Sequence, residues 1–338
     1  MLTGGKQITQ GTYSCIFSPP LRCVSGTKIP PSKPRISKLM EKKYALDEWE
    51  LSKKIRVIPN WRNYFSVAET EPCEVEEEHA AKYANSCDFI NETPADKLYS
   101  LQLYYAGKTL RKYSMPAEFN LKRFMVHILE GAALLLVHNI IHNDLHDQNI
   151  VIDKHMIPRI IDFNVSMIKT DQTTTHDLKH DYAHSLLLPQ VSSDYIAVLG
   201  AYYNKHRKDI ARHIGSRKST GDIQRVLSIN PFHANYAIMQ LFNINCIKEG
   251  NLVEWYNLYW TKIDAYSVGM YFIILIKTRS LFQPIIKALR DPMIKRVISQ
   301  LCEPNPIKRW DCMRALHELH PSSIIIRTYG KEWFLKHP

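Results

Sequence analysis

The spacing of hydrophobic and polar positions divides the chain into a β-rich first part and a mostly helical second part. Residues 8–17 alternate loosely and are rich in Thr, Tyr and Ile, whereas the helical segments repeat hydrophobic side chains about every three to four residues. The pattern predicts strands over residues 8–17, 35–40 and 98–105, a helix over 42–57 that stops before Pro59, and a strongly hydrophobic helix over 120–139. We therefore expect an α+β fold whose two parts meet near residues 104–108.

Length and composition agree with this division. The 338 residues suffice for two domains or one bilobal unit, and 45% hydrophobic with 23% charged residues is ordinary globular usage, which excludes a disordered chain. The net charge is +11, from 44 Lys and Arg against 33 Asp and Glu. A basic chain favours anionic partners such as nucleotides, nucleic acid, acidic protein segments or lipid headgroups, and the charge alone does not choose among them.

Cysteine usage and hydrophobic run lengths bear on the cellular compartment. The seven cysteines are odd in number, scattered, and form no Cys-x-x-Cys pair, which argues against a disulfide framework and favours a reducing compartment. The first residues lack a hydrophobic run of signal-peptide length, and no run approaches the ~18 residues that a membrane span needs. These patterns predict a soluble, intracellular protein without a membrane span.

The segment Ile141–Ser166 carries the candidate chemistry. Asp144 and Asn149 precede a hydrophobic triplet at 150–152, and a second short strand leads to Asp162. A strand–turn–strand hairpin would bring Asn149 and Asp162 together, and two oxygen-bearing side chains are suitable ligands for Mg²⁺. Asp144 would then be available to an incoming hydroxyl group.

These residues resemble the catalytic loop and metal motif of the protein kinases, His-Arg-Asp-Leu-x-x-x-Asn followed by Asp-Phe-Gly. They stand here as His142-Asn143-Asp144 with Asn149, and as Asp162-Phe163-Asn164. The resemblance implies a bilobal protein-kinase-like fold with a β-rich N-lobe over residues 1–104 and a helical C-lobe over 105–338. It also implies ATP and Mg²⁺ as cofactors, with transfer of the γ-phosphoryl group to Ser or Thr hydroxyls of proteins. An acidic insert over 69–97 and a long activation segment over 162–254 would be additions to that plan.

The resemblance assigns further site residues. Lys38, in Ile36-Ser37-Lys38, matches the lysine that holds the ATP phosphates, and Glu48 is preferred over Glu50 as its partner on the following helix. The glycine-rich loop is reduced to Gly11, with Thr9 and Ser14 at the other glycine positions. The expected nucleotide pocket comprises Gly11, Ile16, Ile36, Lys38, Leu103, Tyr104, Ala106 and Val151.

Two later motifs resemble protein kinases rather than small-molecule phosphotransferases. The segment 262–269 matches the Asp-x-Trp-Ser-x-Gly helix start, whose aspartate, here Asp264, braces the catalytic loop. The segment 304–310 matches a Pro-x-x-Arg-Trp segment whose arginine, here Arg309, is structural. The residues near the N-terminus are similar to the Ser/Thr kinase-like proteins of large nucleocytoplasmic DNA viruses, of the iridovirus and mimivirus type. That resemblance implies host cytoplasm or virion as location and viral or host proteins as substrates, with nucleic acid left open as a partner by the charge.

Departures from the family pattern keep two other functions open. Asn143 replaces the arginine that pairs with an activation-loop phosphate in protein kinases. Activity is therefore expected not to require that phosphorylation. His146 replaces a lysine and is also typical of aminoglycoside and choline phosphotransferases, which makes a small-molecule kinase the first alternative. The degenerate glycine loop and Asn164 make a pseudokinase scaffold the second.

Two expectations follow from these departures. His146 titrates near ~6.5 in its reference state, so phosphorylation is expected to rise as the pH falls from about 8 toward 6.5. No Ala-Pro-Glu motif is present; residues 230–233 are a candidate for its place, and Glu254 is a candidate partner for Arg309.

A histidine cluster has the spacing of a metal site. His176, His180 and His184 repeat at i, i+4 and i+8, accompanied by Asp177 and Asp181, which is metal-ligand spacing on a helix. No Cys or Glu motif accompanies them. A solvated or locally packed helix is the preferred interpretation, and zinc is the alternative.

Overall fold

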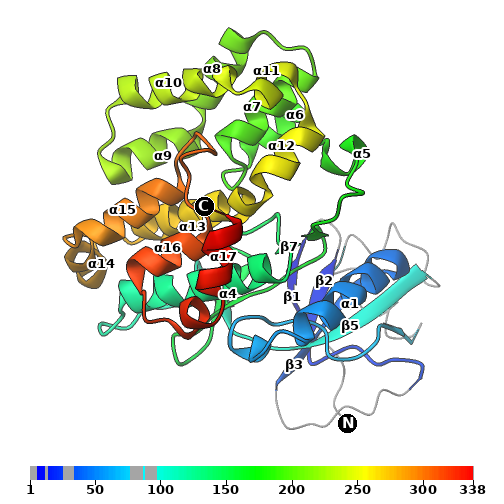
Figure 1. The fold of residues 1–338 in the computed structure, drawn as a ribbon. Coiled ribbons are helices and arrows are strands. Elements are labelled where there is room, and N and C mark those ends of the chain that lie inside the picture. The colour runs from blue at the N-terminus through cyan, green and yellow to red at the C-terminus, as the bar shows by residue number, and fades with distance from the viewer. Residues whose placement is uncertain (1–5, 12–13, 26–33, 77–86, 88–96, 338) are drawn as a thin grey trace. The chain divides into compact units, whose positions relative to one another are not determined.

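The computed structural model describes residues 6–11, 14–25, 34–76, 87 and 97–337. The chain forms two compact units, each with its own set of internal contacts (Figure 1). The first unit comprises residues 1–107 with 161–164, and the second comprises 108–160 with 165–338. The first unit is rich in strands and the second in helices, which agrees with the α+β class expected from the sequence.

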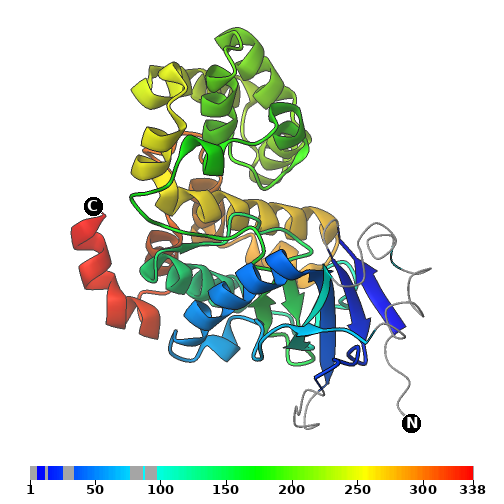
Figure 2. The same cartoon turned by 90° about the vertical axis from the view of Figure 1, so that its right-hand side faces the viewer.

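The first unit is built on a five-stranded antiparallel sheet with the order β1-β2-β3-β5-β4 (Figure 2). The predicted strand over residues 8–17 is two strands, because Gly11 donates its N–H to the Ser14 carbonyl at 2.8 Å between them. The strands at 35–40 and 98–105 are confirmed. The strands are β1 (Lys6–Gln10), β2 (Cys15–Ser18), β3 (Arg35–Glu41), β4 (Cys73–Glu74) and β5 (Leu98–Tyr104).

Helix α1 (Lys42–Arg56) follows β3 directly and confirms the helix predicted there. It packs on β3 and β5 through one face that includes Ala45, Leu51 and Ile55, with spacing typical of an amphipathic helix. Glu48 lies on this same buried face, and Ser52 donates its hydroxyl to the Glu48 carbonyl at 2.7 Å. A carboxylate on a buried helix face requires a charged partner, which identifies Glu48 as a residue to examine.

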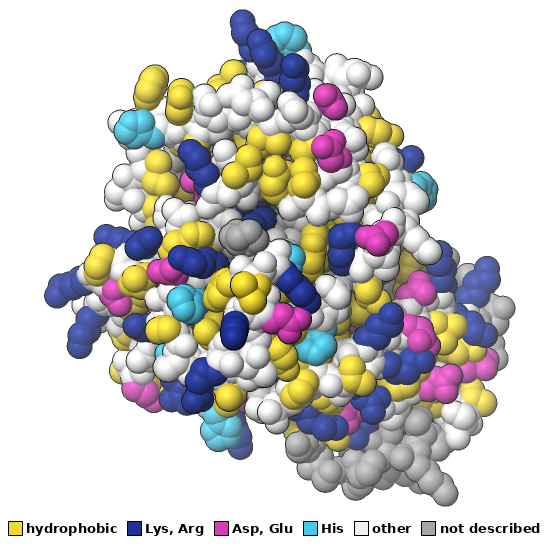
Figure 3. Space-filling view, in the orientation of Figure 1, with side chains coloured by type: hydrophobic (Ala, Val, Ile, Leu, Met, Phe, Trp, Pro, Cys, Tyr) yellow, Lys and Arg dark blue, Asp and Glu magenta, His cyan; other side chains and the backbone are white. Residues whose placement is uncertain are grey.

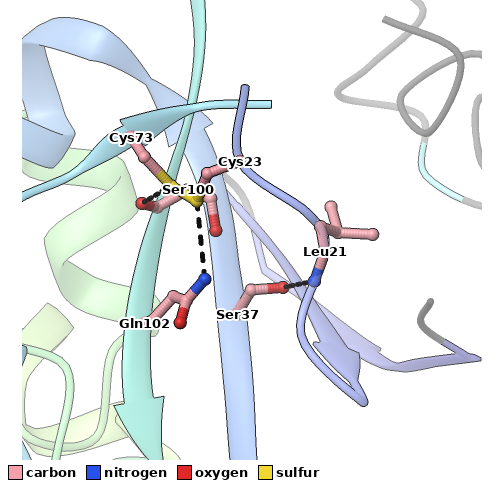
Figure 4. Close-up of a disulfide and its surroundings, with 6 residues drawn as sticks. All are labelled: Leu21, Cys23, Ser37, Cys73, Ser100 and Gln102. Carbon is pink, nitrogen blue, oxygen red and sulfur yellow. Dashed lines mark hydrogen bonds between the residues drawn. A yellow bond between two sulfur atoms is a disulfide. The ribbon is translucent and has the colours of Figure 1, made fainter. Parts of the chain in front are cut away.

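Two disulfides link parts of the first unit that are far apart in sequence. Cys15 is bonded to Cys87 and Cys23 to Cys73, with sequence separations of 72 and 50 residues. Around the second pair, the Gln102 amide donates to the Cys23 sulfur at 3.5 Å, and the Leu21 N–H donates to the Ser37 hydroxyl at 3.0 Å (Figure 4).

The expectation of a chain without disulfides is therefore wrong for these four cysteines, and the inferred reducing compartment loses that support. Strand pairing brings β2, β4 and β5 into one sheet, and no local spacing in the sequence reveals this pairing. The other three cysteines are free and buried: Cys246, Cys302 and Cys312. Of the predicted acidic insert over 69–97, residues 77–86 and 88–96 lie outside the described part of the chain.

The second unit is organised around two hydrophobic helices, α4 (Leu121–Val137) and α13 (Ile263–Thr278). Helix α4 confirms the predicted helix over 120–139, and the Asn120 side chain caps it by accepting the Arg123 N–H. Helix α13 carries Gly269, where a Cβ would lie 2.7 Å from the Cys302 sulfur. The helices α14 (Gln283–Ala288), α15 (Pro292–Leu301), α16 (Cys312–Leu319) and α17 (Lys331–Lys336) complete this part.

Short strands carry the predicted catalytic segment. Strands β8 (Ile150–Ile152) and β9 (Pro158–Ile160) form the predicted hairpin, with Ile150 opposite Ile160. Strand β6 (Lys108–Thr109) pairs with β8, and β7 (Ile140–Ile141) pairs with β10 (Met167–Ile168). The segment Ile141–Asn149 is therefore held between two strand pairings within the second unit.

A group of short helices separates β10 from α13 (Figure 2). They are α5 (Thr175–Leu178), α6 (Tyr182–Leu187), α7 (Ser193–Tyr202), α8 (Arg207–Ser216), α9 (Lys218–Leu227), α10 (Pro231–Gln240), α11 (Asn245–Glu249) and α12 (Leu252–Tyr259). Helix α7 packs on α8 and α11, and α9 packs on α13, so these helices form part of the second unit. Among the described helices, none is both long enough and hydrophobic enough to cross a membrane.

Candidate active site

Three predicted site residues form a network of ion pairs in the first unit. The Lys38 ammonium, on β3, lies 2.7 Å from Glu48 Oε2 of α1 and 2.7 Å from Asp162 Oδ1. The side chains of Lys38 and Glu48 are 5% and 3% exposed, whereas that of Asp162 is 33% exposed. Glu50 instead pairs with Lys53 on the solvent side of α1. The structure thus brings Lys38, Glu48 and Asp162 together.

The charge state of this group follows from its surroundings. Burial on its own lowers the pKa of Lys38, but the negative charges and hydrogen bonds of Asp162 and Glu48 outweigh burial, so its pKa is raised and the ammonium stays charged. Burial raises the pKa of Glu48, opposed by the Lys38 charge. The firmly charged lysine is the feature that an anionic phosphate requires.

Asp162 and Phe163 occupy a distinctive turn. Asp162 has a φ of +67°, in the left-handed region that Asp tolerates better than most side chains. The Phe163 ring is 2% exposed and packs edge-on against Phe65, with ring centroids 6.0 Å apart. This packing fixes the backbone beside Asp162.

The other nucleotide-pocket candidates in the first unit lie on or next to the sheet. Ile16 is opposite Lys38 on β2, and Ile36 is opposite Leu103 on β5. The Tyr104 carbonyl already accepts the Ser66 hydroxyl at 3.2 Å, and Ala106 follows β5 in the link to the second unit. Gly11 lies in the turn between β1 and β2. Val151 lies in the second unit, on β8, opposite Arg159.

The loop that holds Asp144, the predicted catalytic loop, is braced by Asp264 in the second unit. Its carboxylate accepts the backbone N–H of His142 at 2.7 Å and that of Asn143 at 2.9 Å. Asp264 is 1% exposed, and burial raises its pKa against the opposing effect of these hydrogen bonds. Asn143 has a φ of +65°, a conformation for which asparagine is well suited. The loop backbone next to Asp144 is therefore fixed.

The Asp144 carboxylate is surrounded by three donors. Asn149 donates its amide to Asp144 Oδ2 at 3.2 Å and to the Asp144 carbonyl at 2.9 Å. His146 Nε2 lies 3.4 Å from the same Oδ2, and the Gln190 amide donates to Oδ1 at 2.8 Å. The carboxylate is still 31% exposed. It is both held in one orientation and accessible, which a general base requires.

His146 titrates at a higher pH than the sequence predicted. Burial lowers the pKa of its imidazole, but hydrogen bonds and charges of Asp144 and Asp147 outweigh burial and raise the pKa to about 9. Asp147 is in turn held by Arg111 at 2.5 Å, and its own pKa is lowered, with the His146 hydrogen bond as the largest cause. With a pKa of about 9, His146 keeps its charge from pH 8 to 6.5, so titration of this side chain no longer supports the activity change expected over that range.

The corrected pH dependence is testable. A raised pKa means that the charged form is present below about 9 and is lost as the pH rises through that value. We expect the relative activity of His146→Lys and the wild type to be constant from pH 6.5 to 8 and the wild type to fall behind above pH 9. Initial rates of phosphate incorporation across this series measure it. A wild-type advantage that changes between pH 6.5 and 8 would contradict the assignment.

The donor chemistry of Asn149 and Asp162 fits magnesium. The Asn149 nitrogen is committed to Asp144, so the amide oxygen is the end left for a cation, and no described residue donates to it. Asp162 provides a partly exposed carboxylate. Amide and carboxylate oxygens are the ligands that Mg²⁺ prefers. Both predicted metal ligands thus have suitable chemistry, each within its own unit.

Arg309 has a partner that the sequence did not predict. Its guanidinium lies 2.5 Å from Asp194 Oδ1, and both side chains are fully buried. Asp194 also accepts the indole N–H of Trp255 at 2.9 Å. Glu254, the candidate named from the sequence, instead lies at the start of α12 with Asn251, so that candidate is wrong. Residues 230–233, the candidate for the place of Ala-Pro-Glu, cap and begin α10.

The histidine cluster has a structural explanation. Asp177 forms a capping box with Thr174 at the start of α5, and Asp181 caps α6 by accepting the His184 N–H. His180 packs edge-on against Tyr195, and burial lowers the pKa of its imidazole. Within the described ranges, no three His, Cys, Asp or Glu side chains are placed to hold a metal ion.

Sequence reasoning missed Gln190 and Asp194. Gln190 donates to Asp144 across 46 residues of sequence, and Asp194 pairs with Arg309 across 115. The one local signal was the string Ser192-Ser193-Asp194, which is typical of a helix start and begins α7. An acidic residue there could have been tested as the partner of Arg309.

Parts of the chain are similar in sequence to known protein kinases. Residues 32–191 match the protein kinase domain model. A segment of 87 residues, 25% of this chain, is 32% identical to the mitogen-activated protein kinase kinase kinase YODA of Arabidopsis thaliana. The aligned part is only 10% of that relative. Both matches are to protein kinases, and they support a relationship of residues 32–191 to the protein kinase superfamily.

Proposed function

We propose that this protein is an Mg-ATP-dependent protein kinase that transfers the γ-phosphoryl group to Ser or Thr hydroxyls of proteins. The observation that carries the proposal is the extent of the kinase match, because residues 32–191 include Lys38, Glu48, Asp144, Asn149 and Asp162. A domain that kept the fold and lost the chemistry would not need all five. Their retention, together with the buried pairing of Lys38 and Glu48, favours an active enzyme over a pseudokinase scaffold.

The proposed roles follow from each side chain. Lys38 neutralises the α- and β-phosphates, and Glu48 orients Lys38. Asp144 orients the attacking hydroxyl and accepts its proton. Asp162 and Asn149 would hold the magnesium ion, which supplies electrostatic stabilisation of the phosphates when bound. Such catalysis is mostly positioning and electrostatics, so these few groups carry most of it.

The proposed substrate class is protein rather than small molecule. The bracing of the catalytic loop by Asp264 and the buried Arg309 correspond to motifs typical of protein kinases. His146 is the feature that favours an aminoglycoside or choline kinase. The net charge is not concentrated in one basic stripe on the face that Figure 3 shows, where Lys and Arg side chains are spread among acidic and hydrophobic ones. A viral origin, with viral or host proteins as substrates, belongs to the proposal through the resemblance of the N-terminal residues.

One experiment separates these functions. Purified protein is incubated with radiolabelled ATP and a generic basic protein, a generic acidic protein, or a panel of aminoglycosides and choline. We expect labelled protein with phosphoserine or phosphothreonine as product. Labelling of the small molecules alone would support the rival enzyme class, phosphotyrosine would contradict the Ser/Thr assignment, and no transfer to any acceptor would favour the scaffold.

Activity is expected to be independent of activation-segment phosphorylation. Asn143 cannot form the charge-assisted bidentate pair that arginine makes with a phosphate. Enzyme treated with phosphatase, which is then removed, should keep most of its rate of phosphate incorporation. A large loss that autophosphorylation restores would contradict this expectation.

A further inference from the structure

We propose that Gln190 is a positioning residue for the Asp144 base, and that Arg217, from the helices inserted before α13, holds the segment that carries Gln190. The proposal rests on the proposed kinase function. It assigns a catalytic purpose to the inserted helices, which the kinase motifs do not explain. All residues involved lie in the second unit.

The first step is the contact between Gln190 and Asp144. Gln190 is buried, with 8% of the residue exposed, and its side-chain amide donates to Asp144 Oδ1 at 2.8 Å. Asn149 and His146 both approach the other oxygen, Oδ2. A carboxylate oxygen accepts two hydrogen bonds, so Oδ1 retains one acceptor position. Gln190 thereby fixes the plane of the carboxylate. The remaining acceptor position of Oδ1 is left for the substrate hydroxyl that receives the phosphoryl group.

The second step is the anchoring of the backbone that carries Gln190. Arg217 lies between α8 and α9 and is 6% exposed. Its guanidinium donates to the Leu186 carbonyl at 3.2 Å and to the Leu188 carbonyl at 2.5 Å. The Ser267 hydroxyl of α13 donates to the Gln190 carbonyl at 3.0 Å. Three hydrogen bonds therefore fix residues 186–190 from two other parts of the unit.

The segment that carries Gln190 needs an anchor that does not depend on phosphorylation. An activation segment must be ordered before its residues can position a base, and phosphorylation often supplies that order through an arginine. Asn143 lacks a guanidinium group. A buried Arg217 that forks across two backbone carbonyls orders the segment without any modification. Its long planar side chain suits this, because a guanidinium carries five donors in a fixed geometry.

Substitutions at Gln190 test the first step. Gln190→Met keeps the side-chain size and removes the donor, and Gln190→Glu replaces the donor with a carboxylate that repels Asp144. We expect kcat to fall about 10- to 100-fold in both variants, the loss typical of one hydrogen bond to a charged group. For Gln190→Met, the variant that adds no charge, the KM for ATP and the thermal unfolding temperature should stay at wild-type values. A packing role for Gln190 would leave kcat unchanged in Gln190→Met and would overturn this step.

Substitutions at Arg217 test the second step with a readout that needs no activity. In Arg217→Met, hydrogen–deuterium exchange of the amides in residues 186–191 should rise and kcat should fall, whereas Arg217→Lys should show a smaller effect on both. Arg225→Met is the matched control, because Arg225 lies on α9 with a 73% exposed side chain and pairs only weakly, at 3.4 Å, with Asp222. The control should match the wild type in both measurements.

The outcomes are distinguishable from failure of the proposed function. Unchanged exchange over 186–191 in Arg217→Met, measured on variants whose circular dichroism matches the wild type, would overturn the anchoring role. If Arg217→Met does not fold, Arg217→Lys decides the same point. A wild-type protein that transfers no phosphate contradicts the kinase proposal, and the exchange experiment would still decide whether Arg217 anchors the segment.

Discussion

Asp144→Asn is expected to lower phosphate transfer about 10²- to 10⁴-fold while leaving ATP binding close to that of the wild type. The asparagine has nearly the same shape and can still be held by Gln190 or Asn149, but its amide cannot accept the proton of the attacking hydroxyl. Asp144 is 31% exposed, so the substitution leaves no buried charge unpaired and the fold should be unaffected. Phosphate incorporation and fluorescent-nucleotide binding, each with magnesium, measure the two effects.

The control for this prediction is Asp162→Asn. Asp162 pairs with Lys38 and is a proposed metal ligand, so its loss should weaken magnesium-dependent nucleotide binding itself. The two variants should therefore separate, with one defective in transfer and the other in binding. Equal phosphate incorporation by the wild type and Asp144→Asn would show that Asp144 is not the base.

The features predicted from sequence are those that local pattern determines. Residues 35–40 and 42–57 form β3 and α1, and the helix at 120–139 forms α4, because side-chain periodicity records which face is buried. The hairpin of β8 and β9 follows from two short hydrophobic runs around a turn. Lys38 and Glu48 are only ten residues apart on adjacent elements, so their contact is within the reach of sequence reasoning.

The features missed from sequence depend on contacts between distant segments. The partners Cys15 and Cys87, and Arg309 and Asp194, are joined by the fold and by no spacing rule. The pKa of His146 was also missed, because it depends on the groups that surround the side chain in the fold. Its reference value predicts titration near neutral pH, but two adjacent carboxylates raise it to about 9, and that arrangement is visible only in three dimensions.

Arg309→Met is expected to lower the free energy of unfolding by about 3–5 kcal/mol, the largest effect on stability among the substitutions considered. The Arg309 and Asp194 side chains are both 0% exposed, so the substitution leaves the Asp194 carboxylate buried without its cation. Arg309 also donates to the carbonyls of Glu303 at 2.7 Å and Pro304 at 3.0 Å, and these acceptors would lose their donor as well. Urea unfolding followed by tryptophan fluorescence measures the change.

Two further variants show whether the unpaired charge causes this loss. Arg314→Met on the neighbouring helix α16 removes an arginine that is 49% exposed and pairs with Glu318 at 2.8 Å, and it should change stability by no more than about 0.5 kcal/mol. The double variant Arg309→Met with Asp194→Leu should recover part of the loss, because an apolar pair carries no buried charge. Recovery will be incomplete, since the Trp255 indole N–H then lacks its acceptor. A double variant less stable than Arg309→Met alone would show that the lost hydrogen bonds, and not the unpaired charge, dominate the cost.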